Sequence, residues 1–161
     1  MAKFVGAFVN KIDAQGRVSV PADFRAAVAG GGFDGVACFP AFTDQAIEGG
    51  GVDLLEDIQS MIEELDPYGD EREAFEFAVM SEARKLSFDS DGRITLPAEF
   101  MDLADLEGRA AFVGRGRRFQ IWRPEAYADR RAEARARAKE LRGLLSSPRR
   151  RGAMTPGEAA E

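Results

Sequence analysis

The chain has 161 residues, of which 45% are hydrophobic and 31% are charged, a composition typical of a soluble globular protein with one or two small domains. It contains no histidine and one cysteine, Cys38. These absences exclude histidine-dependent catalytic triads, histidine-ligated metals, intrachain disulfides and cysteine metal clusters. We therefore expect a protein that is not an enzyme, with no cofactor and no metal site. A metal-dependent hydrolase built on clustered carboxylates is a remaining alternative.

The N-terminal segment, KFVGAFVNKI, predicts a first strand and not a targeting sequence. Asn10 and Lys11 interrupt its apolar run before it reaches the length of a signal-peptide core or a membrane span. Together with the single cysteine, this segment predicts a cytoplasmic protein with no membrane partner.

Charge is distributed unevenly along the chain. The net charge is −6, but residues 1–108 carry 8 Lys and Arg against 22 Asp and Glu, whereas residues 109–151 carry 14 against 4. The overall acidity argues against a nucleic-acid partner, whereas the basic C-terminal part is compatible with one. The segment RRAEARARAKELRGLL predicts a helix, which is either simply solvated or, with the tail at 148–151, adds non-specific attraction to phosphates.

A twelve-residue motif occurs twice, as DAQGRVSVPADF from position 13 and as DSDGRITLPAEF from position 89. In each copy D-x-x-G predicts a tight turn, because the aspartates, Asp13 and Asp89, can accept backbone hydrogen bonds and the glycines, Gly16 and Gly92, tolerate positive φ. The alternation of R-V-S-V and R-I-T-L then predicts a half-buried strand that ends at a proline.

A short helix is expected after each proline, over ADFRAAVA and AEFMDLA. These helices are expected to bury four apolar side chains on one face: Phe24, Val28, Phe100 and Leu103. Further strands precede the motifs, in KFVGAFVNKI and ARKLSFD, and follow them, in GVACFPAF, AAFVG and RFQIW. Each unit is too small to stand alone, so the two copies are predicted to pack together as an intrachain pseudo-dimer.

Two helices are predicted between the copies, over residues 52–65 and 70–83. Six apolar residues recur at helical spacing: Leu54, Leu55, Ile58, Met61, Ile62 and Leu65. This stripe either faces the core or forms a groove for a partner. The glycine runs at 30–32 and 49–51 predict loops, and neither has the sequence context of a phosphate-binding loop.

The ordered combination of NKIDAQGRVSVPADFR, DSDGRITLP and VGRGRRFQIWRPEAY resembles the MraZ family of bacterial regulators, over about residues 4–127. The resemblance implies an α+β, β-rich fold with two tandem SpoVT-AbrB-type modules of the swapped-hairpin kind, linking helices and a C-terminal helix. The implied domains are 5–51 and 82–127, joined by a helical connector at 52–81 and followed by a basic helix and disordered tail at 128–161.

The resemblance also implies a sequence-specific DNA-binding transcriptional regulator. Its expected partners are double-stranded promoter DNA with direct repeats, upstream of its own division and cell-wall operon, and further copies of itself in a ring, so we expect it to be associated with the nucleoid. The DNA-contacting arginine of the family motif falls on Arg17, with Arg93 as its second-copy counterpart. Many members have lysine where this chain has Gln15, which either loses a phosphate contact or reads a base edge.

A hairpin tip that carries an arginine suits the major groove, where a guanidinium can contact guanine through two hydrogen bonds. Lys11 and Arg25 are expected to lie on or next to the first hairpin and to share in the contacts, whereas the second copy offers Arg93 with Arg84 and Lys85 upstream. Arg17 and Arg93 can instead pair with their own turn aspartates as stabilisers of the fold. A protein-interaction oligomer that does not bind DNA is the competing class.

Overall fold

The computed structural model describes residues 3–145, which form two compact units divided between Tyr127 and Ala128. The first unit contains eight strands, four α-helices and a π-helix: β1 (Ala7–Lys11), β2 (Arg17–Ser19), α1 (Ala22–Val28), β3 (Gly35–Pro40), β4 (Ile47–Gly50), α2 (Val52–Glu63), α3 (Asp70–Phe75), the π-helix (Glu76–Ser81), β5 (Arg84–Ser87), β6 (Arg93–Thr95), α4 (Ala98–Leu103), β7 (Arg109–Gly114) and β8 (Phe119–Trp122). Helix α5 (Pro124–Leu141) begins in the first unit and continues into the second, where a 3₁₀ turn (Arg142–Leu144) follows it.

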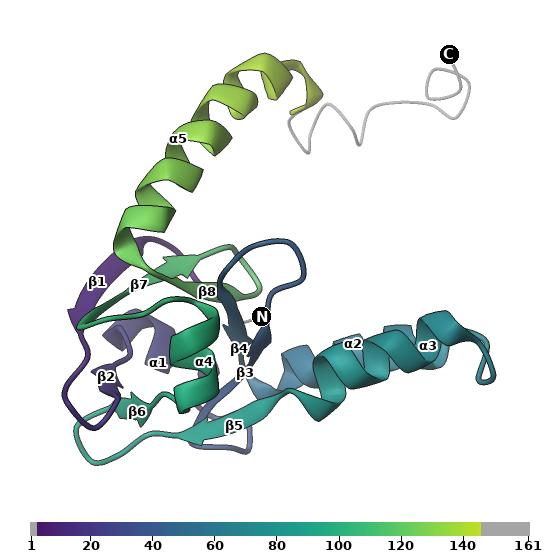
Figure 1. Ribbon diagram of the computed structural model, residues 1–161, viewed down its shortest axis with the longest axis horizontal. Helices are drawn as coiled ribbons and strands as arrows, with labels where there is room; N and C mark the ends of the chain where they lie inside the picture. The colour runs from purple at the N-terminus through teal and green to yellow at the C-terminus, as the bar shows by residue number, and fades with distance from the viewer. Residues whose placement is uncertain (1–2, 146–161) are drawn as a thin grey trace. The chain divides into compact units, whose positions relative to one another are not determined.

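The strands form a six-stranded antiparallel sheet, in the order β1-β7-β8-β4-β3-β5, and a two-stranded sheet of β2 and β6 (Figure 1). If each strand of the first copy is exchanged for its counterpart in the second, the order of the large sheet reads the same from its other end. The two copies are therefore related by a pseudo-twofold axis that passes between β4 and β8 and between β2 and β6.

The first strand of each copy pairs with the other copy. Strand β1 pairs with β7, and β5 pairs with β3, so each copy completes the sheet of its counterpart. At the axis, Val18 of β2 lies opposite Ile94 of β6, and both side chains are buried. This exchange confirms the predicted α+β, β-rich swapped-hairpin pseudo-dimer.

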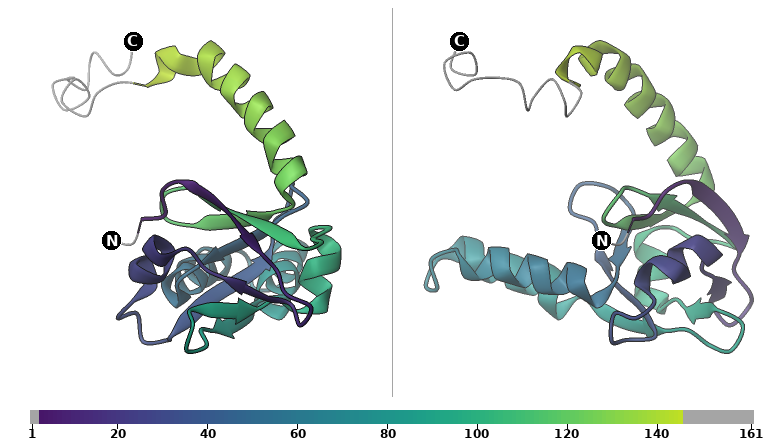
Figure 2. Two further views of the ribbon diagram at one scale, coloured as in Figure 1. Left: turned by 90° about the vertical axis from the view of Figure 1, so that its left-hand side faces the viewer. Right: turned by 180° about the vertical axis from the view of Figure 1, so that it is seen from behind.

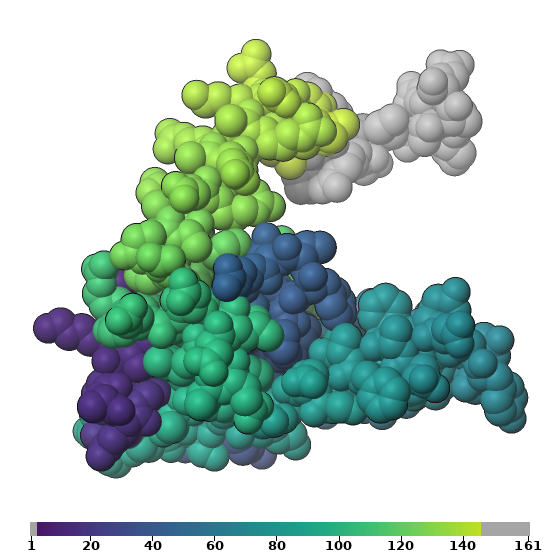
Figure 3. Space-filling model, viewed as in Figure 1, coloured from purple at the N-terminus to yellow at the C-terminus, as the bar shows by residue number. Residues whose placement is uncertain are grey.

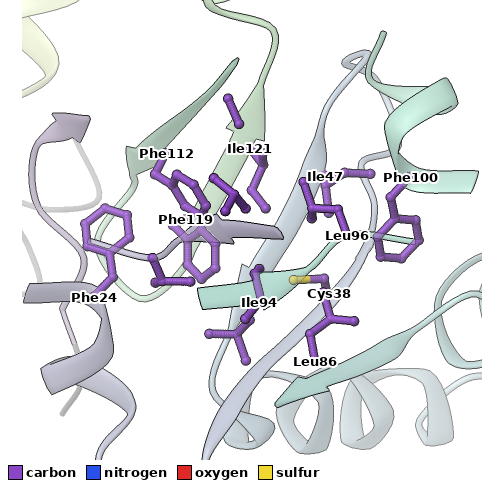
Figure 4. Close-up of a cluster of buried hydrophobic side chains, with 14 of the residues drawn as sticks. Phe24, Cys38, Ile47, Leu86, Ile94, Leu96, Phe100, Phe112, Phe119 and Ile121 are labelled. Atoms are coloured by element: carbon purple, nitrogen blue, oxygen red, sulfur yellow. The ribbon is translucent and has the colours of Figure 1, made fainter. Parts of the chain in front are cut away.

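The main core lies between the large sheet, the small sheet and the helices α1 and α4 (Figure 4). Phe24, Val28 and Phe100 are buried as predicted, but Leu103 is 37% exposed, so its prediction as a core residue is wrong. Ala104, one position further on, is buried in the core instead. Cys38 is also buried there, and burial raises the pKa of its thiol to about 12, which makes it an unreactive apolar side chain.

A buried polar pair lies on the pseudo-twofold axis, where Glu48 of β4 faces Gln120 of β8. The Gln120 amide nitrogen donates a hydrogen bond to Glu48 Oε1, and Gln120 Oε1 accepts one from Trp122 Nε1 at 2.9 Å. Glu48 Oε2 accepts no hydrogen bond within the described residues, but Arg118 Nε lies 3.4 Å from it and Arg115 lies 3.9 Å from Oε1. The two arginines of the β7–β8 turn therefore balance the buried charge.

Helices α2 and α3 project from the sheet (Figure 2). The apolar stripe of α2 is only partly a core face: Leu55 is buried against β3, with Leu54 and Ile58 beside it, whereas Met61 is 60% exposed. Ile62, the next residue along the helix, is buried, so Met61 lies on the side of α2 that faces solvent. The second predicted helix is α3 followed by the π-helix, and it ends at Ser81.

The glycine run at 49–51 is not a loop, so that prediction is wrong. Gly49 and Gly50 belong to β4, which pairs with β8 and with β3. A Cβ atom on Gly49 would lie 2.4 Å from the Phe119 ring, and one on Gly50 would lie 2.9 Å from the Leu54 side chain. The glycines are in a strand because a neighbouring ring and a neighbouring helix approach the backbone closely. The run at 30–32 does lie in a loop, as predicted.

Candidate nucleic-acid interface

The two D-x-x-G-R turns have the same backbone geometry. In the first, Asp13 Oδ1 accepts hydrogen bonds from the backbone N–H groups of Gln15 and Arg17, both at 2.9 Å. Gly16 has φ +83°, and its N–H donates to the Asp13 carbonyl at 3.0 Å. The backbone N–H of Arg17, the largest contribution, lowers the pKa of the Asp13 carboxyl below its usual value.

The second turn repeats these contacts. Asp89 Oδ1 accepts from the N–H groups of Asp91 at 2.9 Å and Arg93 at 3.0 Å, and Gly92 has φ +75°. The pKa of Asp89 is lowered as well, chiefly by the backbone N–H of Arg93. The four residues predicted to form the turns therefore form them.

Each turn is also bonded to the other copy. The Gly16 carbonyl accepts a hydrogen bond from Leu96 N at 2.9 Å, and the Gly92 carbonyl accepts one from Val20 N at 3.2 Å. Both turns are consequently fixed to the ends of the central β2–β6 pair. A fixed backbone presents its side chains without a further entropic cost on binding.

The Arg17 side chain pairs with its own turn aspartate, one of the two roles that the sequence left open. Its Nε donates to Asp13 Oδ2 at 2.7 Å, and 38% of the side chain is exposed. Among residues 3–145, no hydrogen bond or ion pair holds its two terminal nitrogens. The arginine is thus anchored at one atom and keeps a pair of donors available to a ligand.

The Arg93 side chain is held more completely. Its Nε donates to Asp89 Oδ2 at 3.1 Å, and a terminal nitrogen donates to Asp91 Oδ2 at 3.2 Å. Two carboxylates therefore bond the Arg93 guanidinium, whereas one carboxylate bonds the Arg17 guanidinium. The difference comes from one substitution, since Asp91 stands where the first turn has Gln15.

The remaining predicted contact residues divide between the two turns. Lys11 is exposed and lies opposite Arg109, so two cations adjoin the first turn, and Gln15 is exposed within it. Arg25 was grouped with the first hairpin, but its guanidinium packs over the second turn: a Cβ on Gly92 would lie 2.4 Å from its Nη1, which donates to the Val20 carbonyl at 2.9 Å.

The surroundings of the two turns differ in charge. The position that matches Lys11 in the second copy is Ser87, and a hollow of about 730 Å³ beside the second turn is lined by residues that include Asp34, Asp89 and Asp91. Arg109 was not predicted as part of the site, because only its cross-strand pairing with Lys11 brings it there. The first turn is the more basic of the two.

Arg84 and Lys85 lie on β5, at the edge of the large sheet. Arg84 donates to Glu99 Oε2 at 2.9 Å and to backbone carbonyls of its own segment, whereas the Lys85 side chain is exposed. Within the described part of the chain, no group of three or more acidic, cysteine or histidine residues is placed to hold a metal ion, and no helix is long and apolar enough to cross a membrane.

Comparison with known proteins identifies relatives along most of the chain. A family model described as "MraZ protein, putative antitoxin-like" matches residues 79–145. A curated protein named transcriptional regulator MraZ from Parvibaculum lavamentivorans is 45% identical over 148 residues, covering 91% of this chain and 92% of the relative. Proteins of the same name from Rickettsia bellii and Beijerinckia indica are 44% and 41% identical, covering 90% and 91% of this chain and 95% and 90% of the relatives.

Similarity of this extent is spread over nearly the full length of both chains. The tandem pseudo-symmetric fold and the repeated D-x-x-G-R turn agree with that relationship. The chain therefore belongs to the MraZ family of transcriptional regulators.

Proposed function

We propose that this protein is a sequence-specific DNA-binding transcriptional regulator that reads the major groove with its first D-x-x-G-R turn. The observation that carries the proposal is the half-anchored Arg17: Nε is held by Asp13, and the terminal nitrogens are directed by that bond yet remain free of described partners. Two adjacent donors on one guanidinium match the O6 and N7 acceptors of guanine.

Neighbouring residues support the same assignment. Lys11 and Arg109 lie on adjacent strands beside the turn, and Arg109 also bonds Glu125 Oε1 at 3.3 Å. Lys11 therefore suits a contact to phosphate oxygens, which position a protein on the duplex without reading its sequence. Gln15 is exposed at the turn and can accept from or donate to a base edge. Arg25, which packs over the second turn, serves as a minor phosphate contact at most.

The second turn contributes less in this proposal. Arg93 is bonded to two carboxylates, and the acidic lining of the nearby hollow repels phosphate. We therefore assign Arg93 chiefly to the stability of the fold and Arg17 to recognition.

A single small turn binds DNA weakly, so the proposal includes several protomers that engage repeated sites together. A ring-shaped homo-oligomer on direct repeats in the promoter of its own division and cell-wall operon would multiply the weak contacts. The family name of its relatives, transcriptional regulator, supports this role and a place at the nucleoid in the cytoplasm.

The test is a gel-shift titration of the DNA upstream of the gene with the wild type, Arg17→Ala and the matched variant Arg93→Ala, at two salt concentrations. Loss of a bidentate contact costs about 1–3 kcal/mol per site, so Arg17→Ala should weaken binding roughly 5- to 150-fold for each engaged protomer. Arg93→Ala should bind nearly as the wild type does, after correction for any unfolded fraction.

Lys11→Ala should weaken binding to specific and unrelated DNA by similar factors and should reduce its dependence on salt. Retention of specific, salt-sensitive binding by folded Arg17→Ala would contradict the proposal. A wild-type protein that binds no DNA but assembles would support the competing class, an interaction module.

A further inference from the structure

The segment from α2 to the end of the π-helix forms an acidic hairpin, defined here as residues 52–82. It contains eleven Asp and Glu residues and one basic residue, Arg72. It also exposes large apolar side chains, with Met61 at 60% exposure and Phe77 at 62%. Figure 3 shows the hairpin standing out from the sheet with its sides open.

An aromatic pair adds to this surface at the base of the hairpin. The rings of Phe42, from the β3–β4 loop, and Phe75, from α3, lie 5.7 Å apart, and these residues are 62% and 40% exposed. Exposed apolar patches on a protein often mark a contact surface, and this exposed aromatic pair indicates one here.

Helix α5 carries the opposite charge in an ordered pattern. All residues from 128 to 145 are exposed. At about 100° per residue, three cations at intervals of four fall on one side, within about 80° of arc: these are Arg131, Arg135 and Lys139. We call them the basic stripe.

The other faces of α5 differ from the basic stripe. Three acidic residues lie on the opposite side of the helix: Asp129, Glu133 and Glu140. Beside the basic stripe, the same spacing places small and apolar residues: Ala134, Ala138 and Leu141. A helix without an apolar face that buries nothing is stabilised by a partner or by its own charge pairs. Among these, Arg137 bonds Glu140 at 2.9 Å, and both lie away from the basic stripe.

We propose that the basic stripe of one protomer docks against the acidic hairpin of a second copy of this chain. The two surfaces are complementary in charge, and the alanine and leucine side chains beside the stripe match the exposed aromatic and methionine side chains of the hairpin. Because every copy carries one surface of each kind, the contact is heterologous and generates a ring when its rotation closes. This inference deepens, and rests on, the homo-oligomer part of the proposed function.

Docking on a second copy accounts for more observations than docking on DNA. Attraction of the stripe to phosphates would leave most carboxylates of the hairpin without a cation, since among the described residues only Asp57 and Glu76 pair with an arginine, and would leave its apolar side chains exposed. The acidic side of α5 would also be held close to a polyanion. One contact between copies would offset part of the negative charge of the hairpin and cover its apolar side chains at once.

The experiment is a charge exchange between the two surfaces in the full chain, read by mass photometry and sedimentation velocity without DNA. One variant, Arg135→Glu/Lys139→Glu, reverses the centre of the stripe, and the other, Glu71→Lys/Glu73→Lys, reverses exposed charges of α3. A control on another face of α5, Ala136→Glu/Arg137→Glu, changes the net charge by a similar amount.

Each stripe or hairpin variant should weaken self-association at least tenfold, and an equimolar mixture of the two should assemble as the wild type does, because the exchanged charges pair again. The control should assemble normally, and Arg17→Ala should assemble while failing to bind DNA, which separates this inference from the recognition proposal. Circular dichroism checks that each variant is folded.

Normal assembly of both charge variants, or failure of their mixture to assemble, would overturn the inference. So would reduced DNA affinity of the stripe variant with unchanged assembly, since α5 would then be a DNA contact. A wild-type chain that stays monomeric, with the stripe variant altering only its thermal stability, would place the contact within one chain and would also overturn it.

Discussion

The first and second turns share one backbone and differ in what their arginines can do. Asp13 and Asp89 make matching sets of hydrogen bonds, but Arg17 is held by one carboxylate and Arg93 by two. Duplication preserved the residues that shape the turn while the residue before the glycine diverged from Gln15 to Asp91, or the reverse. The structural role of this motif is therefore separable from the binding role that we propose for it.

The copies also differ inside the core, and this difference should give the largest measurable effect. Phe24 packs its ring against those of Phe4, Phe119 and Phe8 at 5.3, 5.4 and 5.7 Å, whereas Phe100 makes no ring contact within the described residues. Truncation of a buried phenylalanine costs about 3–5 kcal/mol. The loss in free energy of unfolding, measured with urea, should lie near the upper end of this range for Phe24→Ala and near the lower end for Phe100→Ala. Equal losses would show that the ring contacts add nothing.

The turn glycines should give the next effect. Both need positive φ, so Gly16→Ala and Gly92→Ala should each lower the free energy of unfolding by about 1–2 kcal/mol. A Cβ on Gly16 would meet the backbone carbonyl of Leu96 at 3.1 Å, whereas one on Gly92 would meet the movable Arg25 side chain at 2.4 Å. The Arg25 side chain can move aside, whereas the Leu96 carbonyl is fixed in the backbone. Gly16→Ala should therefore show the larger fall in melting temperature. The reverse order would mean that Arg25 is held rigidly.

Exchange of the divergent residue tests the comparison of the arginines directly. Gln15→Asp should give a terminal nitrogen of Arg17 a carboxylate partner, as Asp91 does for Arg93, and should weaken promoter binding about tenfold in a gel shift. Asp91→Gln, the matched control, should change binding little. If Gln15→Asp binds as the wild type does, the terminal nitrogens of Arg17 are not the reading group.

The smallest expected effect is on acid stability. The pKa values of Asp13 and Asp89 are lowered by folding, so their stabilisation is present above the unfolded value near 3.8 and is lost as pH falls through the folded values. Asp13→Asn and Asp89→Asn should each lower the melting temperature at pH 6 and leave it nearly unchanged at a pH low enough to protonate the wild-type aspartates. A variant with the full pH dependence of the wild type would show that its aspartate does not contribute.

Local features were predictable from the sequence, and distant contacts were not. The turns, the strands after them and the short helices follow from neighbouring residues, so the repeat alone predicted them and the pseudo-dimer that they form. Leu103, Gly49 and Gly50 were misassigned because Ala104 takes the core position and because Phe119 and Leu54 approach the glycines from other elements. The exposure of Met61 beside the buried Ile62 likewise depends on which side of α2 the other elements cover.

The sequence by itself determined the charge difference between the two turns and the backbone bonds that shape them, because these depend on residues at most four positions apart. Only the tertiary structure decided that Arg109 lies beside Lys11 and that Arg25 covers the second turn. Those outcomes depend on which strands pair across the pseudo-twofold axis. That pairing is set by the burial of both copies in one core, which no local pattern specifies.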